Sequence, residues 1–561
     1  MKEYFKKNEN RIVWLVTVIT MLIACSPLIT RYCINGHDID YHLLRIESLK
    51  EGIQIGKPFL KVNVLFFGEA GYASSMFYPD FLLYIPALLR VFGLSINTSY
   101  HVFVAICVIL CYFSMYYCVR NMLNSKYAGI LSAIIVTLCQ YHMDDIYVRS
   151  AAGEYTAFIF LPLVFYGIYD LLYEDMKKPW LLGAGFGGVL LCHTASFAMC
   201  LLFAAAACIL RIKAFKNKKT LLRLIATAAI TAGLTAVYWL PMIEQLLDTV
   251  FYVSDPWIEP ATEAVRFVEV FYNSFPSLGI FVVVFSLPRI LLKKEAENSE
   301  ASDRYSTKNL ISFSDYLLIA GFLFALLATD ILPWERFGKY LSFIQFPWRF
   351  FIMSSVLFSM ADGIILYLCA RKYSPKRFDI PLEGIVAVVV LIVCGVSAYG
   401  DMSANDQGYY DYSDDYYDYK PYTAHVIGGE WLPEAVMDPE TLVLESERMI
   451  ADDEVTVDFV REKNTIKADI TAAYDHIDVP FIYYKGYEAY IENGTGKKEL
   501  RVTGEGNNGF VRVYLTPQTT GKMTVLYAGT LAQIISKVIT LLSVITLIVI
   551  SISENRKKKE A

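Results

Sequence analysis

Residues 12–45 read IVWLVTVITMLIACSPLITRYCINGHDIDYHLLR and join a long apolar run to a strongly polar stretch. The run from Ile12 to Thr30 is long enough to cross a bilayer as a helix. The stretch from Asn35 to Arg45 then brings two carboxylates, two imidazoles and a guanidinium to the mouth of that helix. The sequence therefore predicts a membrane anchor that leads directly into a loop with reactive side chains.

The acidic pair Asp38-x-Asp40 is the first candidate site. This spacing lets two carboxylates converge on one cation or one transferred group when the backbone is extended or turning. Both residues are therefore candidate catalytic groups and candidate ligands of a divalent metal such as Mg²⁺ or Mn²⁺. The alternative is a solvated loop that begins a helix, with Asp38 or Asp40 as its cap.

Composition indicates a polytopic membrane protein. Hydrophobic residues make up 55% of the 561 residues, and the mean hydropathy is +0.40. The net charge of −6 says little about partners, because the charges are segregated along the chain. Eleven cysteines without a CxxC pair support neither a disulfide framework nor a zinc site.

Twelve apolar segments are predicted to cross the membrane. Lys and Arg cluster at both termini and in every second loop between these segments. The positive-inside rule therefore puts these loops and both termini in the cytoplasm. The short stretch Phe81 to Phe92 contains Pro86 and is predicted to lie in the outer interface, since a crossing there would reverse every later basic loop. The predicted crossings are 12–30, 98–121, 127–141, 155–173, 180–193, 194–212, 221–241, 274–292, 312–331, 349–370, 382–400 and 531–552.

The segments between these crossings define the expected domains. Alternating apolar and polar residues separated by Gly, Asn and Pro turns follow residue 441 and predict a small β domain. The stretch before it is acidic and rich in tyrosine, which is typical of a linker. The predicted organisation is a multi-helix membrane domain 1–400 with a first outer loop 31–97 and interfacial helix 81–92, a linker 401–440, an extracytoplasmic β-sandwich-like domain 441–530, a last transmembrane helix 531–552 and a basic cytoplasmic tail 553–561.

Several strings, taken in their order along the chain, resemble a known group of proteins. The chain resembles bacterial YfhO-like membrane proteins and the group labelled 6-pyruvoyl-tetrahydropterin-synthase-related, a label that does not imply pterin chemistry. Both are similar to the GT-C class of integral-membrane glycosyltransferases. The strings are GHDIDYHLLRIESL from Gly36, Tyr78-Pro79, Arg149 with Gly153-Glu154, His193-Thr194, Trp239-Leu240-Pro241 with Glu244, Gln345-Phe346-Pro347-Trp348-Arg349, Gly429-Glu430-Trp431-Leu432-Pro433 and PFIYYKGYEAY from Pro480 to Tyr490.

The resemblance implies transfer of a sugar from a polyprenyl-phosphate carrier to a glycan or lipid acceptor on the outer face. It also implies that an acidic residue of the first outer loop, here Asp38 or Asp40, is the catalytic base or a metal ligand. A second acidic cluster falls in later predicted outer loops. Its members are Asp144, Asp145, Glu154 and Glu244.

Departure of a phosphate needs cationic help, which the planar fork of arginine supplies well. Each candidate arginine has an alternative role, because an arginine at a helix end often reaches toward lipid headgroups. His193 could equally be a hydrogen-bonded interhelical histidine, and Glu244 could be structural. The candidate phosphate ligands are Arg149, Arg349, Arg45 and His193, with Arg266 behind them, and the candidate sugar or acceptor contacts are His37, His42, Tyr78, Gln345 and Trp348.

The cytoplasmic segments contain no Gly-rich phosphate loop, which disfavours a nucleotide-linked donor. We therefore expect an integral-membrane glycosyltransferase that works in the cell membrane, with a lipid-linked sugar and the bilayer as partners and no nucleic acid. A transporter or flippase for a lipid-linked saccharide is one alternative, and would place charges at mid-membrane. A non-catalytic scaffold for envelope assembly is the other.

Overall fold

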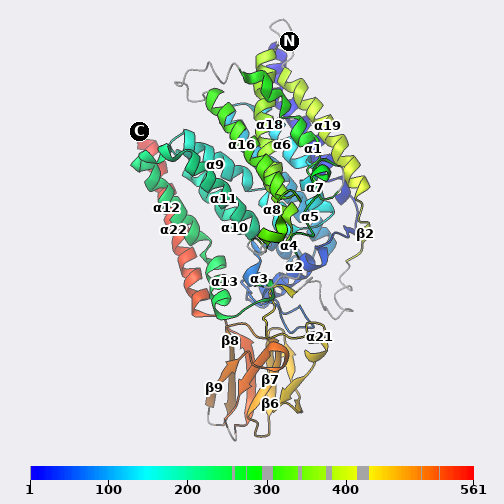
Figure 1. The fold of residues 1–561 in the computed structure, drawn as a ribbon. Coiled ribbons are helices and arrows are strands. Elements are labelled where there is room, and N and C mark those ends of the chain that lie inside the picture. Colours follow the sequence, from blue (N-terminus) through cyan, green and yellow to red (C-terminus); the bar gives the residue numbers. More distant parts are fainter. Residues whose placement is uncertain are drawn as a thin grey trace. The chain divides into compact units, whose positions relative to one another are not determined.

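Apolar helices and one β-sheet make up the computed structural model (Figure 1). The structure describes residues 2–254, 259–272, 275–293, 307–338, 341, 344–374, 382–412, 429–494, 496–516 and 519–560. Internal contacts divide the chain into two compact units. Unit 1 comprises Met1–Ile39, Tyr100–Ala232 and Ile258–Asp411, and unit 2 comprises Asp40–Ser99, Gly233–Trp257 and Tyr412–Ala561.

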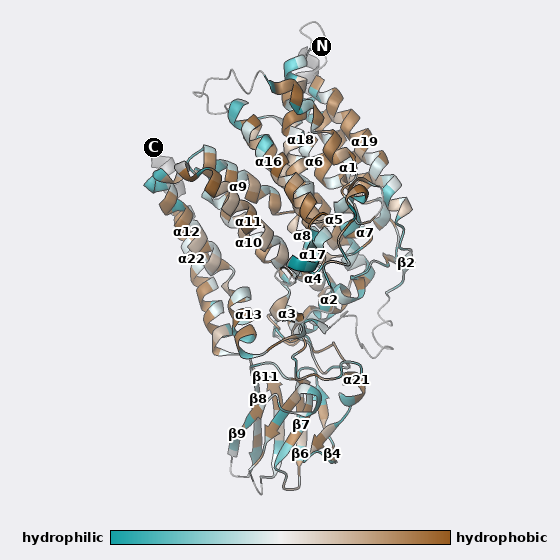
Figure 2. Cartoon of the chain, in the orientation of Figure 1, coloured by the Kyte–Doolittle hydropathy of each residue, from teal (hydrophilic) through white to brown (hydrophobic). Residues whose placement is uncertain are grey.

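Unit 1 is built from helices, most of them apolar along their length (Figure 2). A two-stranded ladder pairs β1 (Cys33–Ile34) with β2 (Tyr409–Tyr410). The helices are α1 Lys2–Ala24, α5 Ile96–Leu123, α6 Lys126–Leu138, α7 Gln140–Tyr147, α8 Ala152–Ala157, α9 Leu161–Tyr173, α10 Pro179–Leu190, α11 Thr194–Leu210, α12 Lys218–Leu234, α14 Phe281–Val284, α16 Thr307–Leu327, α17 Trp334–Phe337, α18 Phe351–Tyr373 and α19 Leu382–Ala404, with 3₁₀ turns at Ser26–Leu28, Ile212–Lys216, Phe267–Phe271, Leu287–Leu292 and Pro347–Phe350.

The helix that contains the first apolar run ends earlier than composition predicts. Helix α1 ends at Ala24, whereas the apolar run continues to Thr30. Pro27 lies inside the 3₁₀ turn that follows, and a proline cannot donate the backbone hydrogen bond that would continue the helix.

The number of candidate membrane spans differs from the expected twelve. By length and composition, six helices of the described residues can cross a membrane, or seven if α12 and α13 (Ala236–Asp248), bent by 72° at their junction, form one span. Helices α6, α10 and α11 have 13, 12 and 17 residues, fewer than the roughly 20 that a bilayer needs. The polytopic helical class is confirmed, and the count of twelve is not.

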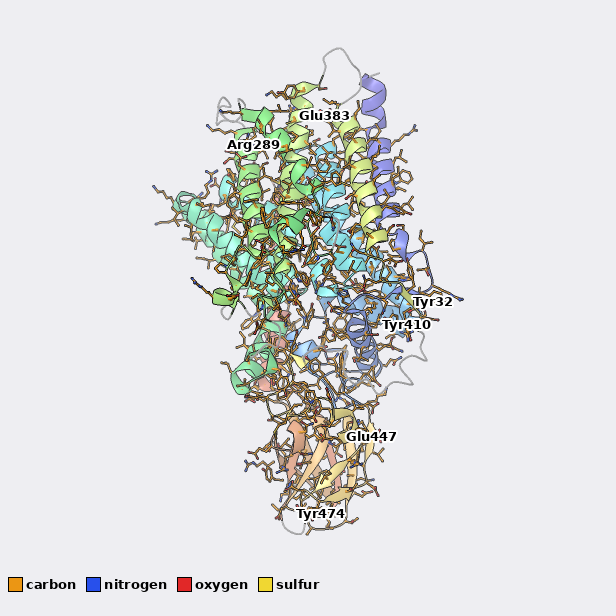
Figure 3. All side chains as sticks on the ribbon, turned by 45° about the vertical axis from the view of Figure 1, so that its right-hand side comes forward. Tyr32, Arg289, Glu383, Tyr410, Glu447 and Tyr474 are labelled. Atoms are coloured by element: carbon orange, nitrogen blue, oxygen red, sulfur yellow. The ribbon has the colours of Figure 1, made fainter. Side chains whose placement is uncertain are left out.

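Arg289 and Glu383 lie toward one end of unit 1, and Tyr32 and Tyr410 lie toward the other (Figure 3). Arg289 makes a bidentate ion pair with Asp315. The end with Tyr32 and Tyr410 carries the β1–β2 ladder, directly before the polar stretch from Asn35. The two ends of unit 1 therefore differ in their chemistry, as a membrane-spanning unit requires.

Unit 2 combines the loop 40–99, helix α13 and the C-terminal β domain. The expected interfacial segment 81–92 forms a 3₁₀ turn and helix α4, in which Arg90 pairs with Glu47 of α2. Within the expected linker 401–440, residues 413–428 lie outside the part that the structure describes. The helical elements of unit 2 are α2 Ile39–Gln54, α3 Ser74–Phe77, α4 Tyr84–Val91, α13 Ala236–Asp248, α21 Leu442–Glu445 and α22 Leu531–Glu560, with 3₁₀ turns at Phe81–Leu83, Tyr252–Ser254 and Asn507–Gly509.

The described residues of the β domain form one antiparallel sheet of nine strands, in the order β4-β3-β7-β10-β9-β8-β11-β6-β5. Strand β9 pairs with β8 through its first half and with β10 through its second half. Apolar side chains from both halves of the sheet meet in a single core. The expected all-β domain is thus confirmed, with strands β3 Met449–Ala451, β4 Val455–Val457, β5 Val460–Glu462, β6 Thr465–Ile470, β7 His476–Ile482, β8 Tyr487–Asn493, β9 Gly496–Thr503, β10 Phe510–Tyr514 and β11 Gly521–Tyr527.

A second apolar core joins the β domain to the loop 40–99 within unit 2. Ile482 N donates to Ala70 O at 2.9 Å, and Trp431 N donates to the Tyr72 hydroxyl at 2.9 Å. Phe77 stacks on Trp431 with ring centroids 4.5 Å apart. These contacts make the loop and the sheet one body.

Candidate functional site

The polar stretch after α1 lies along the loop that follows α7, within unit 1. His37 N donates to Val148 O at 3.1 Å, and Asp38 N donates to Arg149 O at 2.8 Å. Ser150 has a left-handed backbone (φ 55°) and sits against Gly36, where a Cβ would clash with its side chain. The backbone therefore fixes Asp38 beside Arg149.

Arg149 is the centre of an ion cluster. Its Nη1 donates to Asp145 Oδ1 at 3.0 Å and to Glu154 Oε1 at 2.6 Å, and its Nη2 lies 3.4 Å from Asp38 Oδ2. Asp145 lies one helical turn before Arg149, so the pair follows the usual i,i+4 spacing. Three carboxyl groups thus converge on one guanidinium.

Glu154 is the hub that brings two arginines together. Its carboxylate also accepts from Arg349 Nε at 3.0 Å and from the Tyr141 hydroxyl at 2.9 Å. The Glu154 side chain is 1% exposed. We call these residues the Glu154 cluster: Asp38, Tyr141, Asp145, Arg149, Glu154 and Arg349.

In the described residues, Nε and Nη1 of Arg349 are hydrogen-bonded and Nη2 is not. Its Nη1 donates to Gln345 Oε1 at 2.6 Å and to Ile344 O at 3.0 Å. Gln345 adopts a left-handed backbone (φ 59°), which turns the chain before the 3₁₀ turn that carries Arg349. Within the described residues, Nη2 of Arg349 has no hydrogen-bond partner, so this donor can serve a ligand.

Aromatic rings cover one side of the Glu154 cluster. The Arg149 guanidinium lies 4.4 Å from the centroid of the Trp348 ring, a cation–π distance. Phe275 packs on Trp348 with centroids 5.4 Å apart, and His37 packs edge-on to Phe275 at 5.8 Å. His37, Trp348 and Gln345, which the sequence predicted as candidate sugar or acceptor contacts, therefore lie at the Glu154 cluster.

Exposure separates Asp38 from the other charged members. The Asp38 side chain is 36% exposed, whereas Arg149, Asp145 and Glu154 are almost fully buried and Arg349 is 12% exposed. Asp38 is therefore the carboxylate of the cluster that a solute can reach.

Burial changes the charge of two groups near the cluster. It raises the pKa of the Asp145 carboxyl well above its usual value, and the neighbouring Glu154 carboxylate adds to the shift. Burial also lowers the pKa of His193 to about 4, against the attraction of Glu154. His193 Nδ1 lies 2.8 Å from the Ser196 hydroxyl in the first turn of α11, a local contact and not an interhelical one.

A second arginine cluster occupies unit 2, and we call it the Arg45 cluster. Arg45 Nη2 lies 2.5 Å from Asp80 Oδ1 and donates to Pro79 O at 2.8 Å, while Nη1 lies 3.2 Å from His42 Nδ1. Its guanidinium stands 4.6 Å from the centroid of Tyr78. The Arg45 side chain is fully buried. Arg45, His42 and Tyr78 are thus brought together, but in a closed arrangement.

The remaining predicted residues make other contacts. Asp40 is in the first turn of α2, where a carboxylate favours the helix N-terminus. Glu244 accepts from the Thr530 hydroxyl at 2.5 Å, next to the start of α22. Asp144 lies beside Asp401 and shares the amide of Asn405 with it. Arg266 is exposed and pairs with Glu269.

The predicted metal ligands do not form a donor set. Asp38 is engaged by Arg149, and Asp40 lies on α2. In the described ranges, no three His, Cys, Asp and Glu side chains are grouped closely enough to hold a metal ion.

Tyr141, Phe275 and Asp80 complete the two clusters, and the sequence reasoning missed all three. Asp80 directly follows the quoted Tyr78-Pro79 string, so its position was a usable signal. Tyr141 precedes Asp145 by four residues on α7, which puts both on one helix face. Phe275 lies far along the chain from His37 and Trp348, and no local pattern predicts its contacts.

One family model and one curated relative match this chain. A family model described as 6-pyruvoyl-tetrahydropterin synthase related domain, membrane protein, matches residues 75–405. An uncharacterized protein of Lactococcus lactis subsp. cremoris (strain MG1363) is 22% identical over 355 residues, which are 59% of this chain and 56% of that protein. The chain thus spans about half the length of the curated relative that it matches.

Among solved structures, the chain is similar to ArnT from Cupriavidus metallidurans, crystallised with bound undecaprenyl phosphate. The sequences are 12% identical, the match covers 78% of this chain and 81% of that one, and the TM-score is 0.40. A TM-score of this size does not establish a common fold.

Proposed function

This chain belongs to the 6-pyruvoyl-tetrahydropterin synthase related family of membrane proteins, and from that premise we propose that it transfers a sugar from a polyprenyl-phosphate donor to an acceptor outside the cytoplasm. The accessible carboxylate of Asp38, held beside the buried Arg149 in the cluster that also contains Arg349, is the observation that carries the proposal. The reaction needs a base for the acceptor hydroxyl and cations for the departing phosphate, and the Glu154 cluster contains both.

Asp38 acts as the base. Its carboxylate takes the proton of the acceptor hydroxyl while that oxygen forms a bond to the anomeric carbon of the sugar. The bond from that carbon to the phosphate oxygen breaks, and the polyprenyl phosphate leaves with its electron pair. The backbone bond from Asp38 N to Arg149 O keeps the carboxylate in place for this step.

Arg349 receives the departing phosphate. Its Nη2 is the donor without a partner in the described residues, whereas its Nε is held by Glu154. Arg149 is committed to three carboxyl groups, so it adds positive charge rather than a free donor. A fixed guanidinium needs little reorganisation when charge develops on the phosphate.

Aromatic and amide groups around the arginines bind the sugar or the acceptor. Trp348 and His37 supply rings, and Gln345 supplies an amide next to Arg349. Asp40, Arg45, His42 and Tyr78 belong to α2 and the Arg45 cluster, and their roles are to support the fold of unit 2. In this proposal the Glu154 cluster faces outward, with both termini in the cytoplasm and the β domain outside.

The test uses the purified full chain and a panel of polyprenyl-phosphate donors that carry single hexoses or pentoses. We expect Asp38→Asn to lower sugar release by about 10²- to 10⁴-fold, the range that a positioned general base contributes. Asp40→Asn is the matched control and keeps turnover. A chelator leaves the rate unchanged, because the acidic residues offer no metal donor set. Full turnover in Asp38→Asn, or no release by the wild-type protein from any donor, would overturn the proposal.

One observation favours the transporter alternative. Asp362 lies in the middle of the candidate span Pro347–Tyr373 and is fully buried. Ionisable groups at such depth are frequent in transport pathways. Donor flux across proteoliposomes without sugar release would identify this second function.

A further inference from the structure

Asp362 is a buried carboxyl group with no partner. It lies on α18, and both of its oxygens are inaccessible and have no hydrogen bond with any described residue. An isolated carboxylate in an apolar interior costs many kcal/mol, so such a group takes up a proton instead. We therefore expect the Asp362 carboxyl group to be protonated and neutral.

A second proton site is formed by a pair of carboxyl groups, those of Asp144 and Asp401. Asp144 and Asp401 are each 1% exposed, and Asn405 Nδ2 donates to Oδ1 of both, at 3.5 Å and 2.8 Å. Oδ2 of each carboxyl has no partner in the described part of the chain. Two carboxyl groups that share a site cannot both be ionised at neutral pH, so the pair retains one proton.

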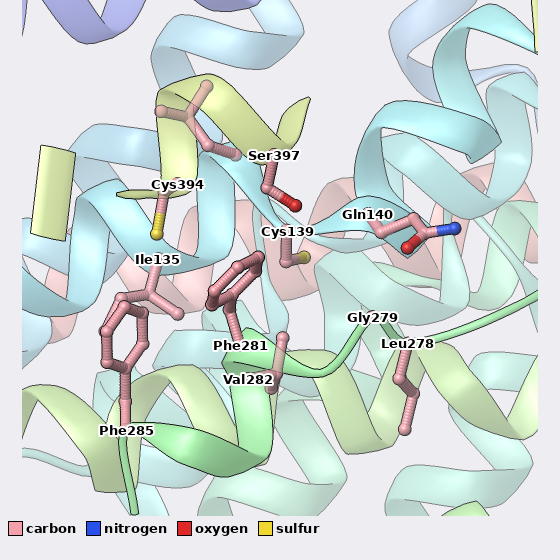
Figure 4. A pocket seen from close by; sticks show the side chains of 11 residues that line it. Ile135, Cys139, Gln140, Leu278, Gly279, Phe281, Val282, Phe285, Cys394 and Ser397 are labelled. Atoms are coloured by element: carbon pink, nitrogen blue, oxygen red, sulfur yellow. The ribbon is translucent and has the colours of Figure 1, made fainter. Parts of the chain in front are cut away.

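A small cavity lies among α6, the start of α7, α19 and the segment 278–285 (Figure 4). Its volume is about 20 Å³, which suits one water molecule. Polar atoms reach it from Gln140, Ser397, Cys139 and Cys394, and Gly279 and Phe281 close it.

Helical spacing connects the cavity to the Asp144–Asp401 pair. Cys394, Ser397 and Asp401 follow one another at i, i+3 and i+7, and so lie along one face of α19 over about 10 Å. Gln140 lies one turn before Asp144 on α7. Cys394 is also an electrostatic neighbour of Asp362. Asp362, the cavity and the Asp144–Asp401 pair therefore form one polar file inside unit 1.

We propose that this file is a proton-binding site, in which Asp362 holds one proton, Asp144 and Asp401 share another, and a water in the cavity relays protons between them. The site takes a proton rather than a metal ion. Cys139, Cys394 and His142 are the other titratable groups around the file, and Asp145 adjoins it on α7. Because Asp145 also contacts Arg149, the proton occupancy of the file acts on the Glu154 cluster through α7. This inference does not depend on the proposed function.

Burial and the neighbouring Asp401 raise the pKa of Asp144 well above its usual value, in agreement with a retained proton. The competing explanation is purely structural. In that case Asp362 and the pair would be ionised and would stabilise the helices through charge.

The test is infrared spectroscopy of the full chain in lipid nanodiscs at neutral pH. Subtracting the spectrum of Asp362→Asn from that of the wild type isolates the bands of Asp362. We expect the C=O stretch of a neutral carboxylic acid to be lost. Asp315→Asn is the matched control, because Asp315 pairs with Arg289 on another candidate span and loses carboxylate bands instead.

Loss of carboxylate bands in Asp362→Asn would overturn the proposal. If that variant does not fold, Asp144→Asn and Asp401→Asn give the same comparison, since each removes one half of the shared proton site. The relay is tested by deuterium exchange of the Asp362 acid band. We expect exchange to slow at least tenfold in Ser397→Ala, which removes the hydroxyl from the cavity without adding atoms to it. An unchanged exchange rate would overturn the relay.

Discussion

The Glu154 cluster of unit 1 and the Arg45 cluster of unit 2 use the same parts in opposite ways. Each joins an arginine to a carboxylate and an aromatic ring. Arg45 is fully buried; its Nη1 and Nη2 contact Asp80, two backbone carbonyls and His42, and its Nε has no partner in the described residues. The Glu154 cluster instead ends in an accessible carboxylate and a guanidinium with a spare donor. An arginine is thus a structural element or part of a site according to whether its unpaired donor and its carboxylate partners can be reached from outside.

The largest effect should come from breaking the closed cluster. We expect Arg45→Ala to lower the free energy of unfolding by about 3–5 kcal/mol, because Asp80 would remain buried without its cation. Thermal unfolding of the full chain in nanodiscs measures the change. Arg266→Ala removes an exposed ion pair and is the control, with little expected change. A stable Arg45→Ala variant that fails to bind donor would reverse the roles of the two clusters.

The open cluster should respond in binding rather than in stability. Arg349→Lys removes the planar guanidinium, in which Nε binds Glu154 while Nη2 is available to a ligand. We expect the KM for donor to rise about 10- to 100-fold, equivalent to about 1.5–3 kcal/mol for a hydrogen bond to a charged group. Steady-state kinetics measure it, and Arg371→Lys at the other end of α18 should match the wild type. An unfolded Arg349→Lys protein would show that this cluster is structural as well.

The two aromatic rings give a finer comparison. Trp348→Leu should lower turnover by about fivefold, because a cation–π contact with Arg149 contributes about 1 kcal/mol. Tyr78→Leu should instead lower the unfolding temperature and leave turnover per folded molecule unchanged. Paired kinetics and thermal unfolding on both variants decide the assignment. Equal effects of the two substitutions on turnover would contradict it.

The smallest effect at neutral pH concerns His193. Its pKa falls from about 6.5 in the unfolded chain to about 4 in the folded protein, so folding favours the neutral ring. The stability contributed by the neutral ring is therefore complete above about pH 6.5 and is lost as the pH falls toward 4. His193→Gln should flatten this acid-side loss of thermal stability without changing the unfolding temperature at pH 7. A parallel pH profile in the variant would assign the loss to another group.

Much of the fold could be predicted from sequence because it rests on local patterns. Apolar runs predict α5, α16, α18, α19 and α22, and alternation predicts the β strands. The number of spans could not be predicted, since α6, α10 and α11 are apolar yet shorter than a bilayer is thick. Pro27 ends α1 early, but composition alone averages over it.

The sequence predicted the residues of the candidate site but not the hydrogen bonds and ion pairs between them. Asp38, Arg149, Glu154 and Arg349 were all named, but Glu154 and Arg349 are 195 residues apart. Such long-range pairs decide which arginine is enclosed by its partners and which keeps a donor for a ligand. Residue spacing carries no information about them. The same limit explains why Arg45 was grouped with the phosphate ligands and why Asp362 was overlooked.

The bond from Ile482 N to Ala70 O has a consequence for how the protein is made. The ribosome adds the residues between these partners in roughly 20 to 80 s, at about 5–20 residues per second. During that interval the apolar side chains of residues 62–77 have no sheet to pack against. The early loop must therefore be shielded by lipid or chaperone until the end of synthesis, and nascent chains that stop before Phe510 should be cleared by proteases.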